Sequence, residues 1–127
     1  MSLVALVVAS LVLCSTEPLP DALGRAIEAQ ESTNNTWAVS GRGARGLWQV
    51  MPISAKVPVV LLHVPFIGRA EGRRVFRWWL RRCQKRRQGV RCALRVYACG
   101  DKGFKRGVCE WYANEVFARM PATRSRR

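Results

Sequence analysis

Glu31 is the residue whose setting in the sequence most suggests chemistry. It continues the helical spacing of Leu23 and Ile27, and a loop rich in Gly and polar residues follows it. A carboxyl on such an apolar stripe is partly desolvated, which disfavours its charged form and raises its pKa. A raised pKa suits a general acid that works near neutral pH. The alternative is a surface acid at a helix C-terminus, where its charge is mildly unfavourable.

The element that carries this glutamate is predicted to be a helix. Asp21 follows Pro20 and is placed to cap a helix that runs to about Glu31. The apolar segment at residues 53–70 is harder to interpret, because Pro58 and Pro65 interrupt it. We expect a short helix or a buried loop in that segment.

Three further helices are predicted from apolar residues at helical spacing, and the fold class is therefore a compact all-α domain. The Gly-punctuated stretch "CGDKGFKRGVC" between the last two is expected to be a loop. The stripes are Val75, Phe76, Trp79, Leu80 and Cys83; then Val90, Ala93, Leu94 and Tyr97; then Val108, Trp111, Tyr112 and Val116.

The cysteines predict disulfides rather than a metal site. Cys83, Cys92, Cys99 and Cys109 form an even set in the C-terminal third. Helical spacing puts Cys92 and Cys99 about 10.5 Å apart, beyond the roughly 7 Å limit for a bridge. Cys83 and Cys92 flank the "RRQGV" turn of a predicted helical hairpin, so the favoured pairs are Cys83 with Cys92 and Cys99 with Cys109. The only histidine, His63, lies far away in an apolar run and is interpreted as structural, so no metal is expected.

Length and charge limit the class of protein. A chain of 127 residues fits one domain, and 49% hydrophobic residues is ordinary for a packed core. Its 22 Lys and Arg residues against 8 Asp and Glu give a net charge of +14. This charge indicates a polyanionic partner such as nucleic acid, an anionic membrane surface or a cell-wall polymer.

The N-terminus resembles a signal peptide, here assigned to residues 1–16. Its apolar run from Leu3 to Cys14 is shorter than the roughly 20 residues that span a bilayer. The alternative is a buried N-terminal segment. Export would remove Cys14 and leave the even cysteine set, which fits an oxidising compartment. Residues 20–119 would then be the folded domain and 120–127 a basic tail.

The stretch "ESTNNTWAVSGRGARGLWQVMP" from Glu31 to Pro52 resembles the signature of the lytic transglycosylases and goose-type lysozymes. Later segments resemble the same family more loosely: "AEGRRVFRWWLRR", "ALRVYACG" and "EWYANEV". The resemblance covers roughly residues 22–118. It implies a lysozyme-like domain that cleaves the bond between N-acetylmuramic acid and N-acetylglucosamine in peptidoglycan, without a cofactor.

The resemblance also implies roles for single residues. Glu31 falls on the family's catalytic acid, and Tyr97 on a tyrosine that hydrogen-bonds near it. The residues implied to line the substrate cleft are Ser40, Gln49 and Met51. Gly43 and Gly46 would let the loop backbone pass close to sugar.

The isolation of Glu31 bears on the reaction. An ordinary glycosidase uses two carboxylates roughly 5 to 9.5 Å apart. Here no carboxylate follows Glu31 until Glu71, and Glu28 lies one turn back on another part of the helix surface. A one-carboxylate mechanism, in which the substrate's acetamido group assists and a 1,6-anhydro product forms, therefore suits the sequence. A lysozyme-type muramidase that uses Glu71 remains an alternative.

Two departures from the family pattern leave other functions open. Ala98 stands where the family has an asparagine, and Asn34 replaces a residue that packs behind the glutamate. A wall-binding protein with impaired catalysis is one alternative. A basic nucleic-acid-binding module is another, since "RRVFRWWLRRCQKRRQGVR" combines arginines with Trp78 and Trp79.

The resemblance predicts peptidoglycan glycan strands as the partner, with no specific nucleic acid and no transmembrane span. The cysteines around the tyrosine motif are similar to those of small transglycosylases associated with secretion systems, pili, conjugation machinery or phages. The expected location is the bacterial periplasm or cell wall, with a virion as the other setting, and the expected state is a monomer.

Overall fold

The computed structural model describes residues 19–121, apart from the side chains of residues 103 and 104. Its α-helices are α2 (Asp21–Ser32), α3 (Pro65–Lys85), α4 (Val90–Cys99), α5 (Asp101–Arg106) and α6 (Glu110–Arg119). Two 3-10 helices, η1 (Pro52–Ser54) and η2 (Val59–His63), precede α3. Among the described residues the only β-pairing consists of isolated bridges around Arg45. The predicted all-α, lysozyme-like fold is confirmed. The predicted signal peptide and residues 122–127 of the tail lie outside the described part.

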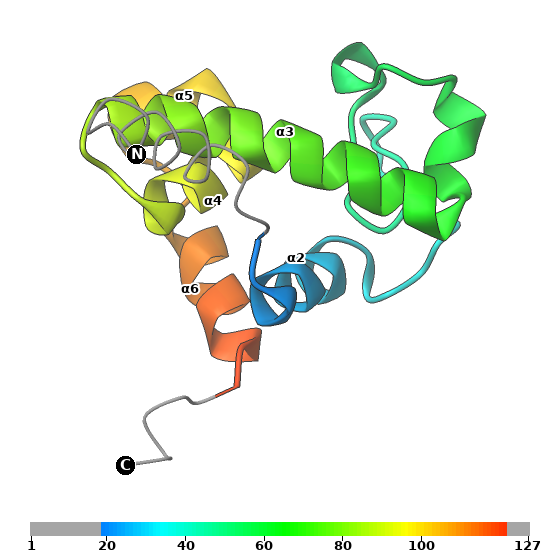
Figure 1. Ribbon diagram of the computed structural model, residues 1–127, viewed down its shortest axis with the longest axis horizontal. Helices are drawn as coiled ribbons and strands as arrows, with labels where there is room; N and C mark the ends of the chain where they lie inside the picture. The colour runs from blue at the N-terminus through cyan, green and yellow to red at the C-terminus, as the bar shows by residue number, and fades with distance from the viewer. Residues whose placement is uncertain (1–18, 122–127) are drawn as a thin grey trace, which may run out of the picture.

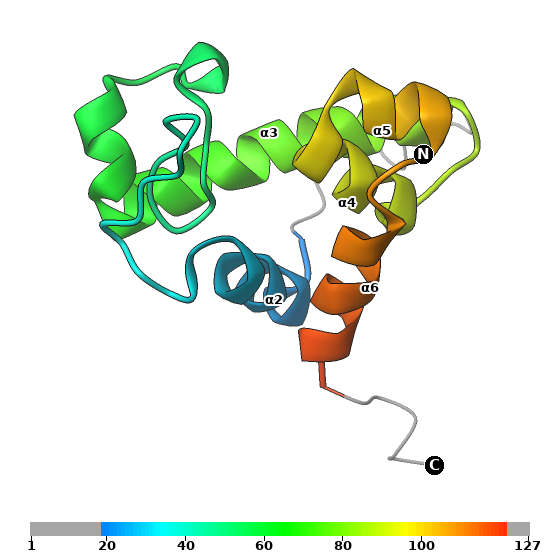
Figure 2. The ribbon, with the colours of Figure 1, turned by 180° about the vertical axis from the view of Figure 1, so that it is seen from behind.

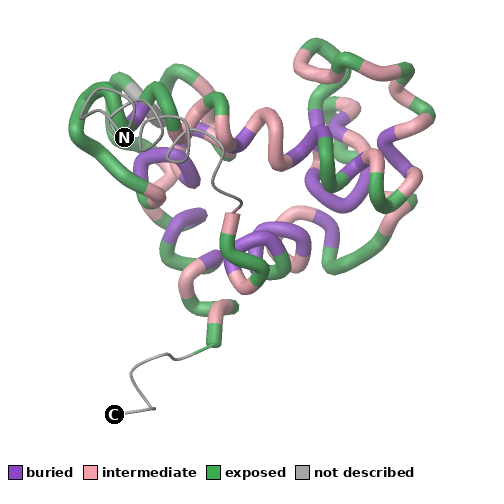
Figure 3. The backbone as a smooth tube through the Cα atoms, in the orientation of Figure 1, coloured by how far each residue is buried: buried purple, intermediate pink, exposed green. Residues whose placement is uncertain are grey.

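The helix α3 runs along the length of the molecule (Figure 1). Residues 33–64, here called the loop lobe, lie at one end of α3, and α4 and α5 lie at the other end in both views (Figures 1 and 2). Below α3, α2 packs beside α6. Buried segments occur in α2 and also in the loop lobe (Figure 3), so the core extends to both ends of the molecule.

Helix α2 buries the stripe that the sequence predicts, with Leu23 and Ile27 almost fully removed from solvent. Its start differs from the prediction. Pro20 is the N-cap residue and no side-chain hydrogen bond caps the helix, so Asp21 lies in the first turn and makes no cap bond. The helix ends because Thr33 adopts a left-handed conformation with φ of 53°. Glu31 therefore lies in the last turn of α2, directly before the loop lobe.

Helix α3 begins at Pro65, two turns before the predicted start at Arg73. Proline lacks an N–H, and the first helical position does not need one, so Pro65 starts the helix instead of breaking it. The predicted apolar stripe is confirmed in part. Phe76 and Cys83 are fully buried, whereas the remaining members are half-buried against the core: Val75, Trp79 and Leu80.

Trp48 joins the loop lobe to the helices. Its side chain is fully buried, and its Nε1 donates a 2.9 Å hydrogen bond to Glu28 Oε1 on α2. Its ring lies directly against Gly72 of α3, where an added Cβ would come within 2.3 Å of Trp48 atoms. Its carbonyl oxygen accepts a hydrogen bond from Tyr97 of α4. One residue therefore fixes α2, α3 and α4 relative to the loop lobe.

The disulfides of the structure are the predicted pairs. Cys83–Cys92 links the end of α3 to the start of α4, with Cα atoms 6.0 Å apart. Cys99–Cys109 links the end of α4 to the residue before α6, with Cα atoms 6.3 Å apart. The segment enclosed by the second bridge contains the short helix α5. The loop predicted there from its glycines is therefore wrong.

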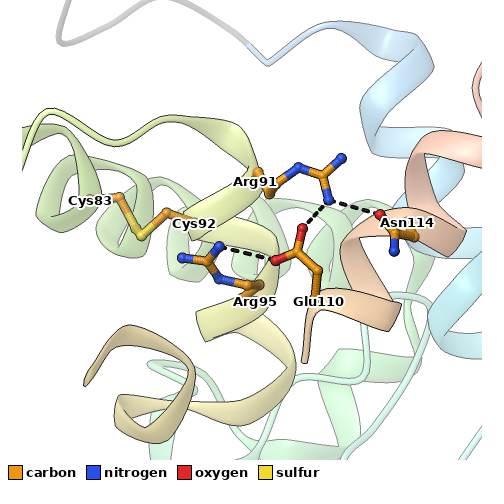
Figure 4. Close-up of polar contacts among 6 residues, drawn as sticks. All are labelled: Cys83, Arg91, Cys92, Arg95, Glu110 and Asn114. Atoms are coloured by element: carbon orange, nitrogen blue, oxygen red, sulfur yellow. Dashed lines mark hydrogen bonds and ion pairs between the residues drawn. A yellow bond between two sulfur atoms is a disulfide. The ribbon is translucent and has the colours of Figure 1, made fainter. Parts of the chain in front are cut away.

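Ion pairs also attach α6 to α4 (Figure 4). The carboxylate of Glu110 accepts hydrogen bonds from Arg91 and, at 3.1 Å, from Arg95, and Arg91 also bonds Asn114 at 2.8 Å. The apolar stripe of α6 is shorter than predicted. Tyr112 and Val116 are buried, but Val108, which lies before the helix begins at Glu110, and Trp111, in its first turn, are 40% and 57% exposed.

Candidate active site

A pocket of about 680 Å³ opens where α2, the loop lobe and the C-terminal helices meet. Glu31 lines it, and so do all the residues predicted to form the cleft: Ser40, Gln49, Met51 and Tyr97. The structure thus brings together residues that are far apart in the sequence. Among the described residues, Glu31 is the only carboxylate in the pocket lining.

The carboxyl of Glu31 is held by a tyrosine from the other end of the chain. Tyr112 donates a 2.6 Å hydrogen bond from its hydroxyl to Glu31 Oε1. Burial raises the pKa of Glu31 from 4.5 to about 7, and the hydrogen bond from Tyr112 opposes this rise. The raised pKa predicted from the helical stripe is borne out, and its cause is the expected desolvation.

Tyr97 lies near this carboxyl but bonds elsewhere. Its hydroxyl donates a 2.5 Å hydrogen bond to the carbonyl oxygen of Trp48, so the direct tyrosine partner of Glu31 is Tyr112. Burial raises the pKa of both tyrosines well above 10, and the Glu31 carboxylate raises it further. Both hydroxyls therefore stay protonated and act as hydrogen-bond donors.

Two of the predicted cleft residues also hold the loop lobe in shape. The hydroxyl of Ser40 accepts hydrogen bonds from the backbone N–H groups of Arg42 and Ala44, at 3.3 and 3.0 Å. The Gln49 amide donates to the carbonyls of Ala38 and Gly46, at 3.1 and 2.8 Å. These bonds use neither the Gln49 Oε1 nor the Ser40 hydroxyl proton, and both residues line the pocket. Met51 lines the same pocket with 36% of its surface exposed.

Two glycines of the loop lobe adopt backbone conformations that other residues rarely adopt, and neither lines the pocket. Gly43 and Gly46 both have positive φ, at 88° and 77°. An added Cβ on Gly46 would lie 2.2 Å from the carbonyl oxygen of Leu62, so this glycine is required for packing against η2. Neither glycine lines the pocket. The expectation that their backbone passes close to sugar stays a prediction.

The other acids near Glu31 are engaged in ion pairs outside the pocket. Glu28 accepts from Trp48 and forms an ion pair with Arg69 at 2.7 Å. Glu71 accepts from the Lys56 backbone N–H at 2.6 Å and pairs with Arg74. Hydrogen bonding to Arg74 is the main cause that lowers the pKa of Glu71. Neither acid lines the pocket.

His63 likewise lies outside the pocket lining. Its Nδ1 is 2.9 Å from the carbonyl oxygen of Thr36, and Trp37 stacks on its ring with centroids 5.3 Å apart. These contacts agree with the structural role expected from the sequence. Among the described residues no group of three His, Cys, Asp or Glu could hold a metal ion.

The pocket therefore combines one partly buried acid, a tyrosine bonded to it and a loop with the quoted signature. A family model for the Transglycosylase SLT domain matches residues 15–108, which is more than half of the chain. The chain belongs to the transglycosylase SLT domain family. No curated protein and no solved structure matches the chain significantly.

Membership in the SLT family supports transglycosylase-type cleavage of glycosidic bonds in peptidoglycan. None of the described helices is both long enough and apolar enough to cross a membrane. Tyr112 lies beyond the matched range, although its hydroxyl contacts Glu31.

Sequence reasoning missed several residues that line the SLT pocket. Tyr112 was assigned only to an apolar stripe, although "EWYANEV" resembled a family segment and could have indicated it. The pocket also includes the cations Arg42 and Lys102 and the aromatic side chains of Trp79 and Trp111. Trp79 and Trp111 were assigned only to apolar stripes, and no sequence pattern identified Arg42 or Lys102.

Proposed function

We propose that the chain is a lytic transglycosylase that cleaves the β-1,4 bond between N-acetylmuramic acid and N-acetylglucosamine, with Glu31 as general acid and then base. The observation that carries this proposal is the raised pKa of Glu31, about 7, in a pocket where it is the only carboxylate among the described residues. A carboxyl with this pKa is about half protonated at neutral pH, and the protonated form can give its proton to a leaving oxygen.

The contacts of Glu31 suggest how its two oxygens are used. Tyr112 donates to Oε1, so Oε2 is the oxygen that would carry the acidic proton toward the bond. As the C1–O bond of the muramic acid breaks, that proton passes to the N-acetylglucosamine oxygen. The substrate's acetamido group assists. The 6-hydroxyl oxygen of the muramic acid then bonds C1 and returns its proton to Glu31, so no water is consumed.

A muramidase that hydrolyses the same bond is less well supported. It requires a second carboxylate to activate water or to act as nucleophile. The nearest sequence candidate, Glu71, is tied to Lys56 and Arg74 and does not line the pocket.

A wall-binding protein with weak catalysis is favoured by one observation. Ala98 lines the pocket and presents only a methyl group where the family has an amide. Restoring that amide with Ala98→Asn tests this alternative, because an impaired enzyme should gain wall lysis.

We propose export to the periplasm or cell wall as the setting of this activity. Peptidoglycan lies outside the cytoplasm, and the disulfides Cys83–Cys92 and Cys99–Cys109 fit an oxidising compartment. The proposal includes a signal peptide at residues 1–16 and a monomeric state. It also includes a role beside a secretion, pilus, conjugation or phage assembly.

The experiment is digestion of peptidoglycan sacculi with purified protein, followed by mass analysis of the released fragments. A transglycosylase gives 1,6-anhydromuramic acid ends, which weigh one water less than hydrolysed ends. Glu31→Gln should abolish release, whereas Asp21→Asn, which removes a charge from the exposed first turn of the same helix, should not. Hydrolysed ends as the main product, or full lysis by a folded Glu31→Gln protein, would refute the proposal.

A further inference from the structure

Two cations line the pocket without a partner. Arg42 and Lys102 both belong to the pocket lining and both are exposed. Among the described residues neither side chain forms an ion pair or a hydrogen bond. Among the described residues the one carboxylate of the lining, Glu31, is bonded to Tyr112, and its pKa of about 7 leaves it about half ionised at neutral pH. The two cations therefore outweigh the one acid, and the pocket lining has a net positive charge.

The two cations project from different parts of the molecule. Arg42 belongs to the loop lobe, and Lys102 belongs to α5. These parts lie toward opposite ends of α3 in both views (Figures 1 and 2). A ligand that reached both would have to be long enough to cross the pocket and to carry more than one negative group.

Each cation is attached to a restrained backbone. Arg42 lies in a turn closed by hydrogen bonds to Ser40: its own N–H and that of Ala44 bond the hydroxyl, and the N–H of Gly43 bonds the carbonyl at 3.0 Å. Lys102 lies in the short segment enclosed by Cys99–Cys109. A restrained base lowers the entropy lost when a charged side chain binds a ligand.

We propose that Arg42 and Lys102 select glycan strands by the carboxylates on the muramic acid side chains, one on each side of the bond that is cleaved. This inference rests on the proposed function. The glycan strand is an alternating polymer in which each muramic acid carries a lactyl group, free or extended by a stem peptide. Negative groups thus recur along the strand on both sides of Glu31.

The pocket separates sugar contacts from charge contacts. Trp79 and Trp111 supply aromatic surface that uncharged sugar rings can pack against. The cations cannot recognise such rings by charge, but they form charge-assisted hydrogen bonds with carboxylates. The pairing therefore predicts preference for acidic glycans over neutral ones of the same length.

The test compares kcat/KM for the full chain on three soluble strand preparations. The first carries intact stem peptides, the second has its carboxylates converted to neutral amides, and the third is trimmed by an amidase to the lactyl carboxylate. We expect amidation to lower kcat/KM about tenfold or more. Trimmed strands distinguish the carboxylates, because only they expose the lactyl carboxylate. Cleavage like that of the intact strands shows that the cations accept either carboxylate, and cleavage like that of the amidated strands assigns recognition to the stem peptide.

The variants Arg42→Gln and Lys102→Gln should each reduce the preference for intact over amidated strands about three- to tenfold. The matched control is Lys105→Gln, which removes an exposed charge from α5 outside the pocket lining and should leave the preference unchanged. Equal cleavage of intact and amidated strands by the unmodified chain would overturn the inference, as would an equal effect of Lys105→Gln.

A binding measurement distinguishes failure of this inference from failure of the proposed function. The Glu31→Gln protein is mixed with the intact and the amidated strands, and the dissociation constants are compared. Tighter binding to intact strands that depends on Arg42 and Lys102 supports the selection even if no cleavage occurs. Equal binding to both refutes the selection even if the unmodified chain cleaves peptidoglycan.

Discussion

Glu31→Gln should stabilise the protein, and the gain should grow with pH. Burial raises the pKa of Glu31 from its ordinary value of 4.5 to about 7. Below pH 4.5 the carboxyl is protonated in both folded and unfolded chains, so it causes no difference. Between these values the folded chain retains a proton that the unfolded chain releases, and stability falls as pH rises. Above pH 7 the folded chain bears the full cost of a desolvated charge.

The magnitude follows from the two pKa values. A change from 4.5 to about 7 corresponds to about 3 kcal/mol of lost stability. Glutamine resembles the protonated acid in shape and keeps an oxygen that can accept the hydrogen bond from Tyr112. The variant should therefore match the unmodified chain near pH 4 and exceed its free energy of unfolding by about 3 kcal/mol at pH 8.

Urea or guanidinium unfolding at several pH values from 4 to 8.5 measures this difference. Asp21→Asn is the control, because it removes the same charge from an exposed position on the same helix. In a chain of net charge +14 the loss of an exposed acid should not stabilise. A difference between Glu31→Gln and the unmodified chain that stays constant from pH 4 to 8 would show that the pKa of Glu31 is not raised.

Further predictions concern contacts that support the same site. Tyr112→Phe removes the hydrogen bond that lowers the pKa of Glu31, so the alkaline limb of the pH–rate profile should move to higher pH, and an unmoved limb would contradict this. Gly72→Ala would normally stabilise a helix by up to about 1 kcal/mol; here the contact with Trp48 should reverse the sign and cost about 2 kcal/mol or more in denaturant unfolding. Glu28→Ala leaves the buried Trp48 N–H without its acceptor and should lower the free energy of unfolding by about 2 kcal/mol, whereas a neutral result would argue against that bond.

Local patterns predicted much of the fold. The spacing of Leu23 and Ile27 correctly identified the buried face of α2, because helical periodicity is a property of neighbouring residues. The start of α3 was missed because a proline that breaks a helix and one that begins it look alike in the sequence. The short helix α5 was missed because its glycines favoured a loop, although a disulfide encloses the segment.

Only part of the site could be predicted from local sequence patterns. Glu31 could be found because its helical position and the following loop are contiguous. The segment "EWYANEV" could have indicated Tyr112 as a site residue, but only the packing of α2 against α6 decides which tyrosine reaches the carboxyl. Arg42 and Lys102 are ordinary surface residues in the sequence and become a pair only through the fold.

The hydrogen bond between Tyr112 and Glu31 spans 81 positions of the chain. During synthesis the glutamate emerges early and its tyrosine late, since translation proceeds from the N-terminus. Until α6 packs beside α2, one wall of the pocket is missing and Glu31 remains open to water. Its carboxyl then titrates as an ordinary acid and is ionised at neutral pH. Glu31 can therefore hold the acidic proton that cleavage would require only after α6 has packed beside α2. Cleavage would then begin only when the domain has finished folding.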